Sequence, residues 1–330
     1  MNKRFTGIVL LGSILALLQG CAPSSYAIDP PEPSTYVFAP DADEDNYRLL
    51  FVDARDDAYS PFGSGTLPLN LTFDGGELQP IAFIGKYTMS ELTARGIPVV
   101  AATDGASEIQ INKMNMRNHR TNAFGPFTTT TLLSADIVTD AGEQRVGAFM
   151  VRGKVPVWSF DEVIEPTMNQ PLELVVQDLA AKINMHLFGH TAPDADVDRL
   201  AGQVRNDPGG DLAYLDVYQL GFSNNPRAIG PLVEFVDSPH EYIRLAAISS
   251  LGSINAREHV DLLIDVFLGK HGSGHWQDRA MAIKSLCDIA VAGDEHAMTF
   301  VRNDAEAALA GETVAGATWS REILGLYLRN

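Results

Sequence analysis

Cysteine is scarce in this sequence, with 2 residues in 330, which excludes a framework of disulfide bonds. Positive charge is scarce as well, because 24 Lys and Arg residues stand against 42 Asp and Glu residues, a net charge of −18. Such a chain lacks the clustered basic residues that attract phosphate backbones, so nucleic acid is excluded as its default partner. The sequence also lacks a nucleotide-binding loop, a nucleophile elbow and an H-E-x-x-H motif. It therefore predicts no catalytic residue, no cofactor and no metal site.

A hydrophobic run long enough to span a bilayer is missing too. The apolar run near the N-terminus covers residues 8–18, about 11 residues where a bilayer needs about 20. Lys3 and Arg4 precede it, which is the pattern of an export signal over residues 1–20. A motif follows with leucine three positions before a cysteine and glycine directly before it: Leu18, Gln19, Gly20 and Cys21.

This motif resembles the lipobox of bacterial lipoproteins. The resemblance implies that the signal is cut before Cys21, that its thiol is diacylated and that the new amine receives a further acyl chain such as palmitate. Several acyl chains suffice for stable anchoring in a bilayer. Ala22 stands where that family's inner-membrane retention signal places aspartate, so in a Gram-negative source the protein is expected on the periplasmic face of the outer membrane. The alternative is an ordinary signal peptide followed by an incidental cysteine.

The segment from Cys21 to residue 46 is rich in proline and ends in a run of acids. At about 3.1 Å per residue, such a self-repelling segment predicts a tether several nanometres long. Removal of Lys3 and Arg4 with the signal leaves 22 basic against 42 acidic residues, a net charge of −20. The rest of the chain has 45% hydrophobic residues overall and a length that predicts two folded units at about 100 to 200 residues each.

The first unit, residues 47–188, carries the alternation of strands followed by the three-and-four spacing of a helix. The predicted elements are a strand at 48–52, a short helix at 89–95, a strand at 109–116 with a bulge at 112–113, a hairpin of 128–139 with 144–157, and a helix at 172–187. Their order from about residue 95 onward resembles the YajG-like family of small outer-membrane lipoproteins. The resemblance implies a membrane-attached α+β module without catalytic residues, and we expect an antiparallel sheet with a packed helix.

The second unit, residues 194–330, is helical and self-similar. Residues 243–254 recur as 278–289, at an offset of 35, and a weaker copy lies 31 residues upstream. Ser238, followed by proline and by glutamate three positions on, predicts a helix N-cap with a capping box. Over about 211 to 292 the sequence resembles HEAT repeats of the bilin-lyase-like type. The resemblance implies an all-α HEAT-like solenoid whose concave face binds protein or peptide.

Four side chains at the start of the second helices are candidates for that binding face: Tyr242, Arg244, Trp276 and Arg279. Aromatic and arginine residues are enriched at the energetic centres of protein interfaces. Arg244 and Arg279 have a second interpretation, because arginines that recur in one register of such repeats also pair with an acid of the neighbouring repeat. Asp237 is the acid that the sequence suggests.

Two further groups have a chemical and a structural interpretation. His271 and His275 lie in a glycine-rich loop with the spacing of a metal pair, but Asp278 is the one further ligand nearby, so a solvated loop is the favoured interpretation. Cys287 falls in an apolar helical pattern and is interpreted as core rather than as a redox thiol. In deoxyhypusine hydroxylase, an enzyme of this repeat class, His-Glu pairs bind iron where this chain has Leu245 and Ala246, so no iron site is carried over.

These patterns together predict a membrane-anchored periplasmic lipoprotein that is not an enzyme. We expect it to act as a scaffold or adaptor that binds another envelope protein through its helical repeats, and its acidity suggests a basic partner surface. The alternative is a small-molecule carrier or an enzyme that uses a pocket between the two units. That alternative requires polar, titratable groups from both units to converge on the pocket.

Overall fold

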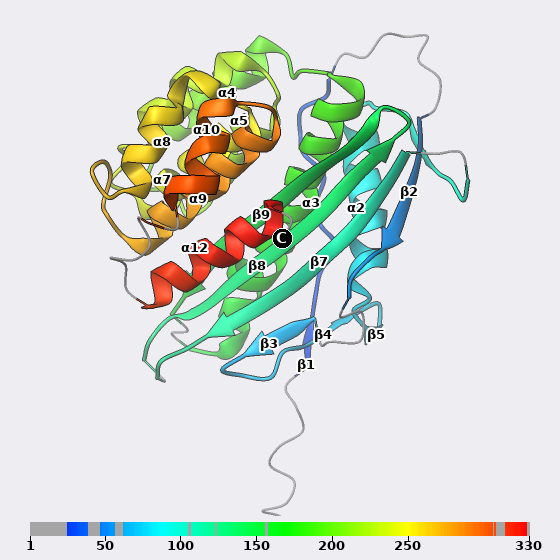
Figure 1. Cartoon of the computed structure of the whole chain (residues 1–330). Helices are drawn as coiled ribbons and strands as arrows, with labels where there is room; N and C mark the ends of the chain where they lie inside the picture. The colour runs from blue at the N-terminus through cyan, green and yellow to red at the C-terminus, as the bar shows by residue number, and fades with distance from the viewer. Residues whose placement is uncertain are drawn as a thin grey trace, which may run out of the picture.

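The computed structural model of the chain describes residues 25–38, 47–56, 62–104, 107–122, 124–155, 158–305, 307 and 314–328. The predicted export signal and lipobox, with Leu18, Gln19, Gly20 and Cys21, lie outside these residues. An N-terminal region built on a mixed sheet is followed by a C-terminal helical region (Figure 1). The prediction of an α+β part followed by a helical part is confirmed at this level.

The main sheet has the strand order β6-β2-β7-β8-β9, and β3 pairs with β7 beside this path. Its strands are β2 (Tyr47–Asp53), β3 (Gly63–Gly65), β6 (Val99–Ala101), β7 (Ser107–His119), β8 (Phe127–Thr139) and β9 (Gly142–Lys154). The expected antiparallel sheet is wrong, because β2 runs parallel to both β6 and β7. Helix α2 (Pro80–Ala94) lies between β2 and β6 in the chain, and such a helical crossover returns the chain in the same direction.

The long strands follow the predicted pattern closely. β8 and β9 form the predicted hairpin, and the register of β7 against β8 shifts between Ile111 and Lys113, where the sequence predicts a bulge. The bulge lets apolar residues stay on one face of β7 on both sides of the slip, since Ile111 and Met114 are both buried. The sequence alternation therefore determined both the pairing and its interruption.

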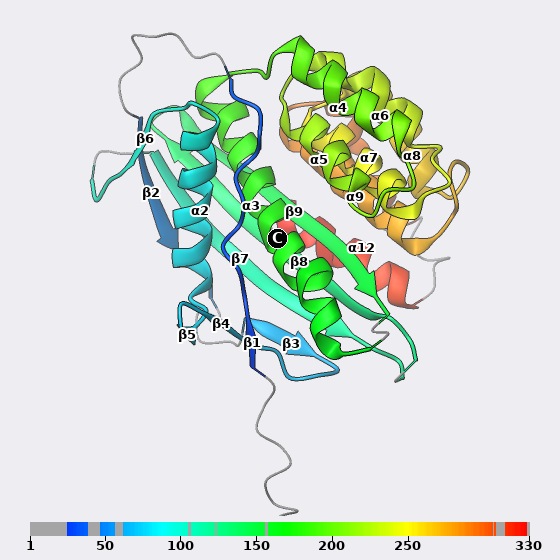
Figure 2. The same cartoon turned by 180° about the vertical axis from the view of Figure 1, so that it is seen from behind.

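One face of the sheet is covered by α2 and by α3 (Gln170–Ile183), which corresponds to the predicted helix at 172–187 (Figure 2). Residues 25–38 run between these two helices. They begin with β1 (Ser25–Ala27), which pairs with β4 (Asn70–Phe73) in a small sheet completed by β5 (Gly76–Glu77).

For residues 25–38 the predicted tether is wrong. Ile28, Tyr36 and Phe38 are at most 4% exposed, and Tyr36 and Phe38 stack around the buried Arg95 guanidinium. The composition is that of a linker, but three large apolar side chains stabilise this segment in the slot between the two helices.

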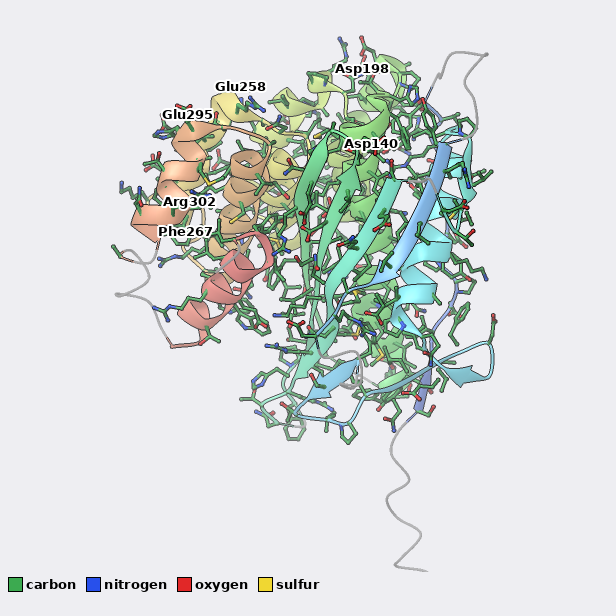
Figure 3. All side chains as sticks on the ribbon, turned by 45° about the vertical axis from the view of Figure 1, so that its right-hand side comes forward. Asp140, Asp198, Glu258, Phe267, Glu295 and Arg302 are labelled. Atoms are coloured by element: carbon green, nitrogen blue, oxygen red, sulfur yellow. The ribbon has the colours of Figure 1, made fainter. Side chains whose placement is uncertain are left out.

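The helical region contains α4 (Asp194–Asn206), α5 (Ala213–Phe222), α6 (Ile229–Phe235), α7 (Glu241–Ser253), α8 (Val260–Phe267), α9 (Trp276–Val291), α10 (Glu295–Thr299) and α12 (Val314–Tyr327). Helices α5, α7 and α9 pack against one another in turn, and α4, α6 and α8 cover their outer side. Exposed acids, among them Asp198, Glu258 and Glu295, lie along that outer side (Figure 3). None of the helices within the described ranges is long and apolar enough to cross a bilayer.

The predicted N-cap at Ser238 is wrong. Helix α7 begins at Glu241, and the Ser238 hydroxyl instead accepts a hydrogen bond from the backbone N–H of His240 at 3.2 Å. This local turn is the competing use of a serine side chain that also makes serine a good cap. Asn225, which also precedes a proline, does cap a helical turn, since its side chain accepts from the N–H of Arg227 at 2.9 Å.

The two regions share one continuous core. Helix α9 packs against β9, and α12 returns from the helical region to lie across β8 and β9 on the face opposite α3 (Figure 1). Four buried charges, which we call the charge cluster, join α3 to α9: Asp178, Lys182, Lys284 and Asp288. The inner helices of the helical region are therefore in contact with the sheet region of the same chain.

Candidate functional site

The four residues predicted to form a binding face do not form one open surface. The Tyr242 hydroxyl lies 3.0 Å from both the N–H and the carbonyl oxygen of Gly153, so Tyr242 docks α7 on β9. Arg244 is 8% exposed, and its guanidinium donates to the Asp278 carboxylate at 2.9 Å and to the Ser238 carbonyl at 2.9 Å. The predicted pairing of Arg244 with an acid of the neighbouring repeat is confirmed in kind, although the acid is Asp278 and not Asp237.

The other two predicted residues, Trp276 and Arg279, belong to the next inner helix, α9. Trp276 stacks on Trp319 with ring centroids 6.5 Å apart, and both rings border a largely apolar hollow of about 670 Å³ beneath Arg117. The Arg279 guanidinium lies over the Phe267 ring at 5.6 Å. The expected concave binding face is thus occupied by the chain's own sheet region and by packing between helices.

A residue that the sequence analysis missed, Arg152, lies at the junction of the two regions. Its guanidinium carbon is 3.7 Å from the ring centroid of Tyr242 and 4.2 Å from that of Tyr214. Arg152 comes from β9, Tyr214 from α5 and Tyr242 from α7, so three elements from both regions meet here. Cation–π contacts of this kind stabilise a guanidinium without using its N–H groups.

Those N–H groups are still available. Arg152 is 8% exposed, and its Nε and Nη1 atoms are buried without a hydrogen-bond partner among the described residues. An unpaired buried donor costs about 1 to 3 kcal/mol, and more when it is charged, so this arrangement favours an acceptor supplied from outside the chain. The Tyr214 and Tyr242 ring centroids are 5.9 Å apart, so the two rings pack against the guanidinium from directions about a right angle apart and do not enclose it. An acceptor can approach from the sides that the rings leave uncovered, and a planar guanidinium binds a carboxylate well because it can donate two parallel N–H bonds.

The tyrosines are themselves held in place. The Tyr214 hydroxyl donates a short hydrogen bond to the Gln170 side-chain oxygen, and Tyr242 is fixed by Gly153. Burial raises the pKa of Tyr214 well above its usual range, so this hydroxyl stays neutral and keeps its donor role. The Arg152 guanidinium therefore contacts two fixed tyrosine rings before any ligand binds.

Arg152 borders a cavity of about 510 Å³ between the regions, within the range of pockets that hold small ligands or peptide ends. Lys154 and His240 add positive or titratable groups to its lining, while Glu165, Asp211 and Glu241 add negative ones. The lining of the cavity thus contains one fixed buried cation, Arg152, and several carboxylates. Such a lining suits a ligand that presents an anionic group to Arg152 and positive charge around it.

One signal in the sequence marks Arg152. It ends an uncharged run, residues 146–151, in a stretch of β9 that is buried without interruption from Val146 to Arg152. A charge on a buried face requires a partner or a ligand. The uncharged run that ends at Arg152 was visible in the sequence. The two tyrosines were not, because they come from helices 62 and 90 residues further along the chain.

The other two groups with a possible chemical role, His271 with His275 and Cys287, have structural contacts within the described ranges. His271 forms an ion-pair contact with Asp237 at 2.9 Å, and no group of three metal-ligand side chains occurs within the described ranges. Cys287 is 1% exposed, and burial raises the pKa of its thiol well above the usual range, as the interpretation as core requires.

Near the cavity, Glu173 of α3 introduces a dependence on pH. Burial, together with the nearby Glu165 and Glu32 carboxylates, raises the pKa of Glu173 to about 7, although Gln177 donates a hydrogen bond to it. The folded protein then binds more protons than the unfolded chain between pH about 4.5 and about 7. Its free energy of unfolding should therefore fall as the pH rises through that window.

The variant Glu173→Gln removes this titration. We expect it to match the wild type in urea unfolding at pH 4, and to exceed it by about 1 to 2 kcal/mol at pH 8, a figure reduced because Glu173 is partly exposed. Equal stabilities of the two proteins at pH 8 would contradict the assignment.

In comparisons with known proteins, no family model and no curated protein matches this sequence.

Proposed function

We propose that this chain is a lipoprotein of the bacterial outer membrane, acylated at Cys21 and facing the periplasm. The proposal rests on the export signal and on the lipobox Leu18, Gln19, Gly20 and Cys21. It is testable by mass spectrometry of the protein extracted from membranes, in which the N-terminal peptide should begin at Cys21 and carry the mass of its acyl chains.

We further propose that the helices α4 to α10 are a HEAT-like repeat array. The argument is the recurrence of one contact: Gly221 lies against Ser250 of the next inner helix, and Gly252 lies against Ser285 of the one after it. The Arg244 to Asp278 pair also crosses from one repeat to the next. A repeated interface of this kind is typical of stacked helix pairs.

The role that the site supports best is non-enzymatic binding, as an adaptor for another envelope protein. The observation that carries it is Arg152, buried against two tyrosines at the edge of a cavity, with its Nε and Nη1 donors unpaired among the described residues. The partner is then a segment that presents a carboxylate, from a chain end or an acidic side chain, within basic surroundings that suit the carboxylates of the lining. The adaptor contact lies at the junction of the regions rather than in the concave face of the repeats.

Site-specific photo-crosslinking in cells tests this role. Leu212 lines the cavity and is 56% exposed, so a photoreactive residue placed there should capture the partner. Arg152→Met should reduce the capture about tenfold, because a bidentate charged contact is worth about 1.4 kcal/mol or more. Arg227→Met, which breaks an exposed pair with Asp198, serves as the matched control and should leave capture unchanged.

Equal capture by the wild type and by folded Arg152→Met would contradict the role of this cavity. Point variants are preferred over deletion of residues 194–330, because the helical region shares its core with the sheet. Thermal unfolding of each variant distinguishes a lost contact from a lost fold.

A second candidate, a carrier of small carboxylic acids, is favoured by the size of the cavity alone. It predicts that a small dicarboxylic or amino acid raises the melting temperature of the wild type and not of Arg152→Met. In that case the crosslinker at Leu212 should capture no protein.

A further inference from the structure

The folded part of the chain begins close to the predicted acylation site. β1 starts at Ser25, only four positions after Cys21. Four residues span at most about 14 Å even when fully extended. An acylated Cys21 would therefore hold the end of the molecule at which β1 starts within that distance of the lipid.

Two exposed aromatic side chains lie at the same end. Phe124, in the connection between β7 and β8, is 90% exposed, and Trp158, just after β9, is 91% exposed. Because Phe127, at the start of β8, pairs with Lys154, at the end of β9, the two connections lie at the same end of the hairpin. In Figures 1 and 2 the start of β1 and the ends of β7 and β9 lie together at the bottom of the molecule.

Packing ties these connections to β1. The Tyr26 ring lies 5.4 Å from the Phe160 ring, which in turn lies 5.0 Å from the Phe127 ring. Tyr26 belongs to β1, Phe160 follows Trp158 closely, and Phe127 follows Phe124. Aromatic contacts therefore link the chain entry to Phe160 and Phe127, which lie two and three residues from the exposed Trp158 and Phe124.

The two connections differ in charge from the whole protein, although the acids Asp161 and Glu162 follow Trp158 within four residues. In a chain of net charge −18, no acidic residue occurs between residues 109 and 135 or between 144 and 160. Arg120 and the exposed Lys154 flank Phe124 and Trp158 in the two connections. Exposed aromatic rings beside basic side chains are the combination that binds the headgroup region of an anionic bilayer.

We propose that Arg120, Phe124, Lys154 and Trp158 form a membrane-contact surface, on which the folded body rests against the lipid. The two rings insert at the level of the headgroups, and the two cations lie against anionic lipid phosphates. This proposal rests on the proposed acylation of Cys21 only for the distance argument, since the aromatic and charge arguments concern the folded residues alone.

The membrane-contact surface also sets how far the Arg152 cavity lies from the bilayer. The backbone N–H of Trp158 donates to the Glu162 carboxylate at 2.8 Å, and Glu162 lines that cavity. With Trp158 at the headgroups, the cavity is presented within a few residues' length of the bilayer and not at the end of a long tether. A partner that reaches it must then itself be close to the membrane.

Lipid quenching of tryptophan fluorescence tests the surface. The acylated full chain is reconstituted in vesicles of phosphatidylethanolamine and phosphatidylglycerol whose acyl chains carry bromine, a quencher that acts over short range. The chain has 3 tryptophans, and the other two, Trp276 and Trp319, are half-buried inside the fold. We expect the signal to fall by about one third, the share of one interfacial tryptophan, and Trp158→Phe to abolish the fall.

A second measurement uses vesicle flotation of the protein after mild alkaline hydrolysis of its two ester-linked acyl chains, which leaves the same single amide-linked chain on every variant. Phe124→Ser combined with Trp158→Ser should lower binding to phosphatidylglycerol vesicles about tenfold or more, since two buried aromatic rings are lost. The matched control changes Val37 and Val100 to serine, which are 51% and 39% exposed near the opposite end of the molecule. This control should bind as the wild type does.

Quenching that is equal in the wild type and in Trp158→Phe would overturn the proposal. So would capture of a protein, without quenching, by a crosslinker placed at residue 158, because the surface would then be a protein interface. Mass spectrometry of the same sample reports separately whether Cys21 is acylated. A missing acyl group with retained quenching would reject the anchor and leave the membrane-contact surface standing.

Discussion

Replacing Lys284 by methionine is expected to lower the free energy of unfolding by about 3 to 5 kcal/mol, because it leaves two buried carboxylates, Asp178 and Asp288, with Lys182 as the one remaining cation of the charge cluster. Lys284 is fully buried, and its ammonium group lies 2.8 Å from the Asp288 carboxylate and 3.7 Å from that of Asp178. It also donates to the Ser253 hydroxyl at 2.8 Å, which in turn donates to Asp178 at 2.9 Å. No water can replace these contacts without opening the core.

The charge cluster is balanced, with two carboxylates and two ammonium groups. Lys182 completes it, at 3.0 Å from Asp178 and 2.9 Å from Asp288. Burial alone would raise the pKa of Asp178, but Lys182 and Lys284 hold it below the usual range. Burial alone would lower the pKa of Lys182, but Asp178 and Asp288 raise it.

The sign of the pH dependence follows from these directions. The lowered pKa of Asp178 contributes stability above the pKa of aspartate in the unfolded chain, and this contribution is lost in acid. The raised pKa of Lys182 contributes stability below the pKa of free lysine, and this contribution is lost in strong alkali. The charge cluster therefore joins the sheet region to the helical region over the whole neutral range.

Urea unfolding at neutral pH measures the effect of Lys284→Met. Lys270→Met is the control, because Lys270 makes an exposed pair with Asp265 and its loss should cost at most about 0.5 kcal/mol. Adding Asp288→Asn to Lys284→Met restores the balance of charge and should recover about 1 to 3 kcal/mol. A loss below about 1 kcal/mol for Lys284→Met would show that the cluster does not hold the two regions together.

The second large effect is expected at Gly252, where two inner helices approach most closely. A Cβ atom added there would lie 2.4 Å from the Ser285 Cα, which is backbone and cannot rotate away. Overpacking of this kind costs about 1 to 3 kcal/mol, more than the gain of up to about 1 kcal/mol that alanine brings over glycine in a helix. Gly252→Ala should therefore destabilise the protein although it improves the helix propensity.

Gly202 in α4 supplies the matched control, because a Cβ atom there meets nothing within 4 Å. Gly202→Ala should stabilise the protein by about 0.5 to 1 kcal/mol. Opposite signs for the two substitutions, measured by thermal and urea unfolding, identify the close helix approach as the cause. If Gly252→Ala also stabilised the protein, the tight packing between α7 and α9 would be rejected.

Features of the fold could be predicted from the sequence where the interactions that form them are local in the chain. The β8–β9 hairpin, the bulge in β7 and helix α3 were predictable because their signals are periodic and local. The repeat of 31 and 35 residues was visible for the same reason, and its glycine positions now have a physical cause in the contacts of Gly221 and Gly252. The capping box failed because a serine side chain satisfies a nearby turn as readily as a helix end.

The sequence by itself determined the long strands β7 to β9, helix α3, the mainly acidic charge and the expectation of a lipid anchor at Cys21, since each is encoded in local periodicity, in composition or in adjacent residues. Only the tertiary structure decided that residues 25–38 pack between α2 and α3, that the inner helices lie against the chain's own sheet, and that Arg152 meets Tyr214 and Tyr242. These are contacts between residues far apart in the chain. No local pattern specifies which buried charge lies beside which ring, because that choice is made by the packing of the whole core.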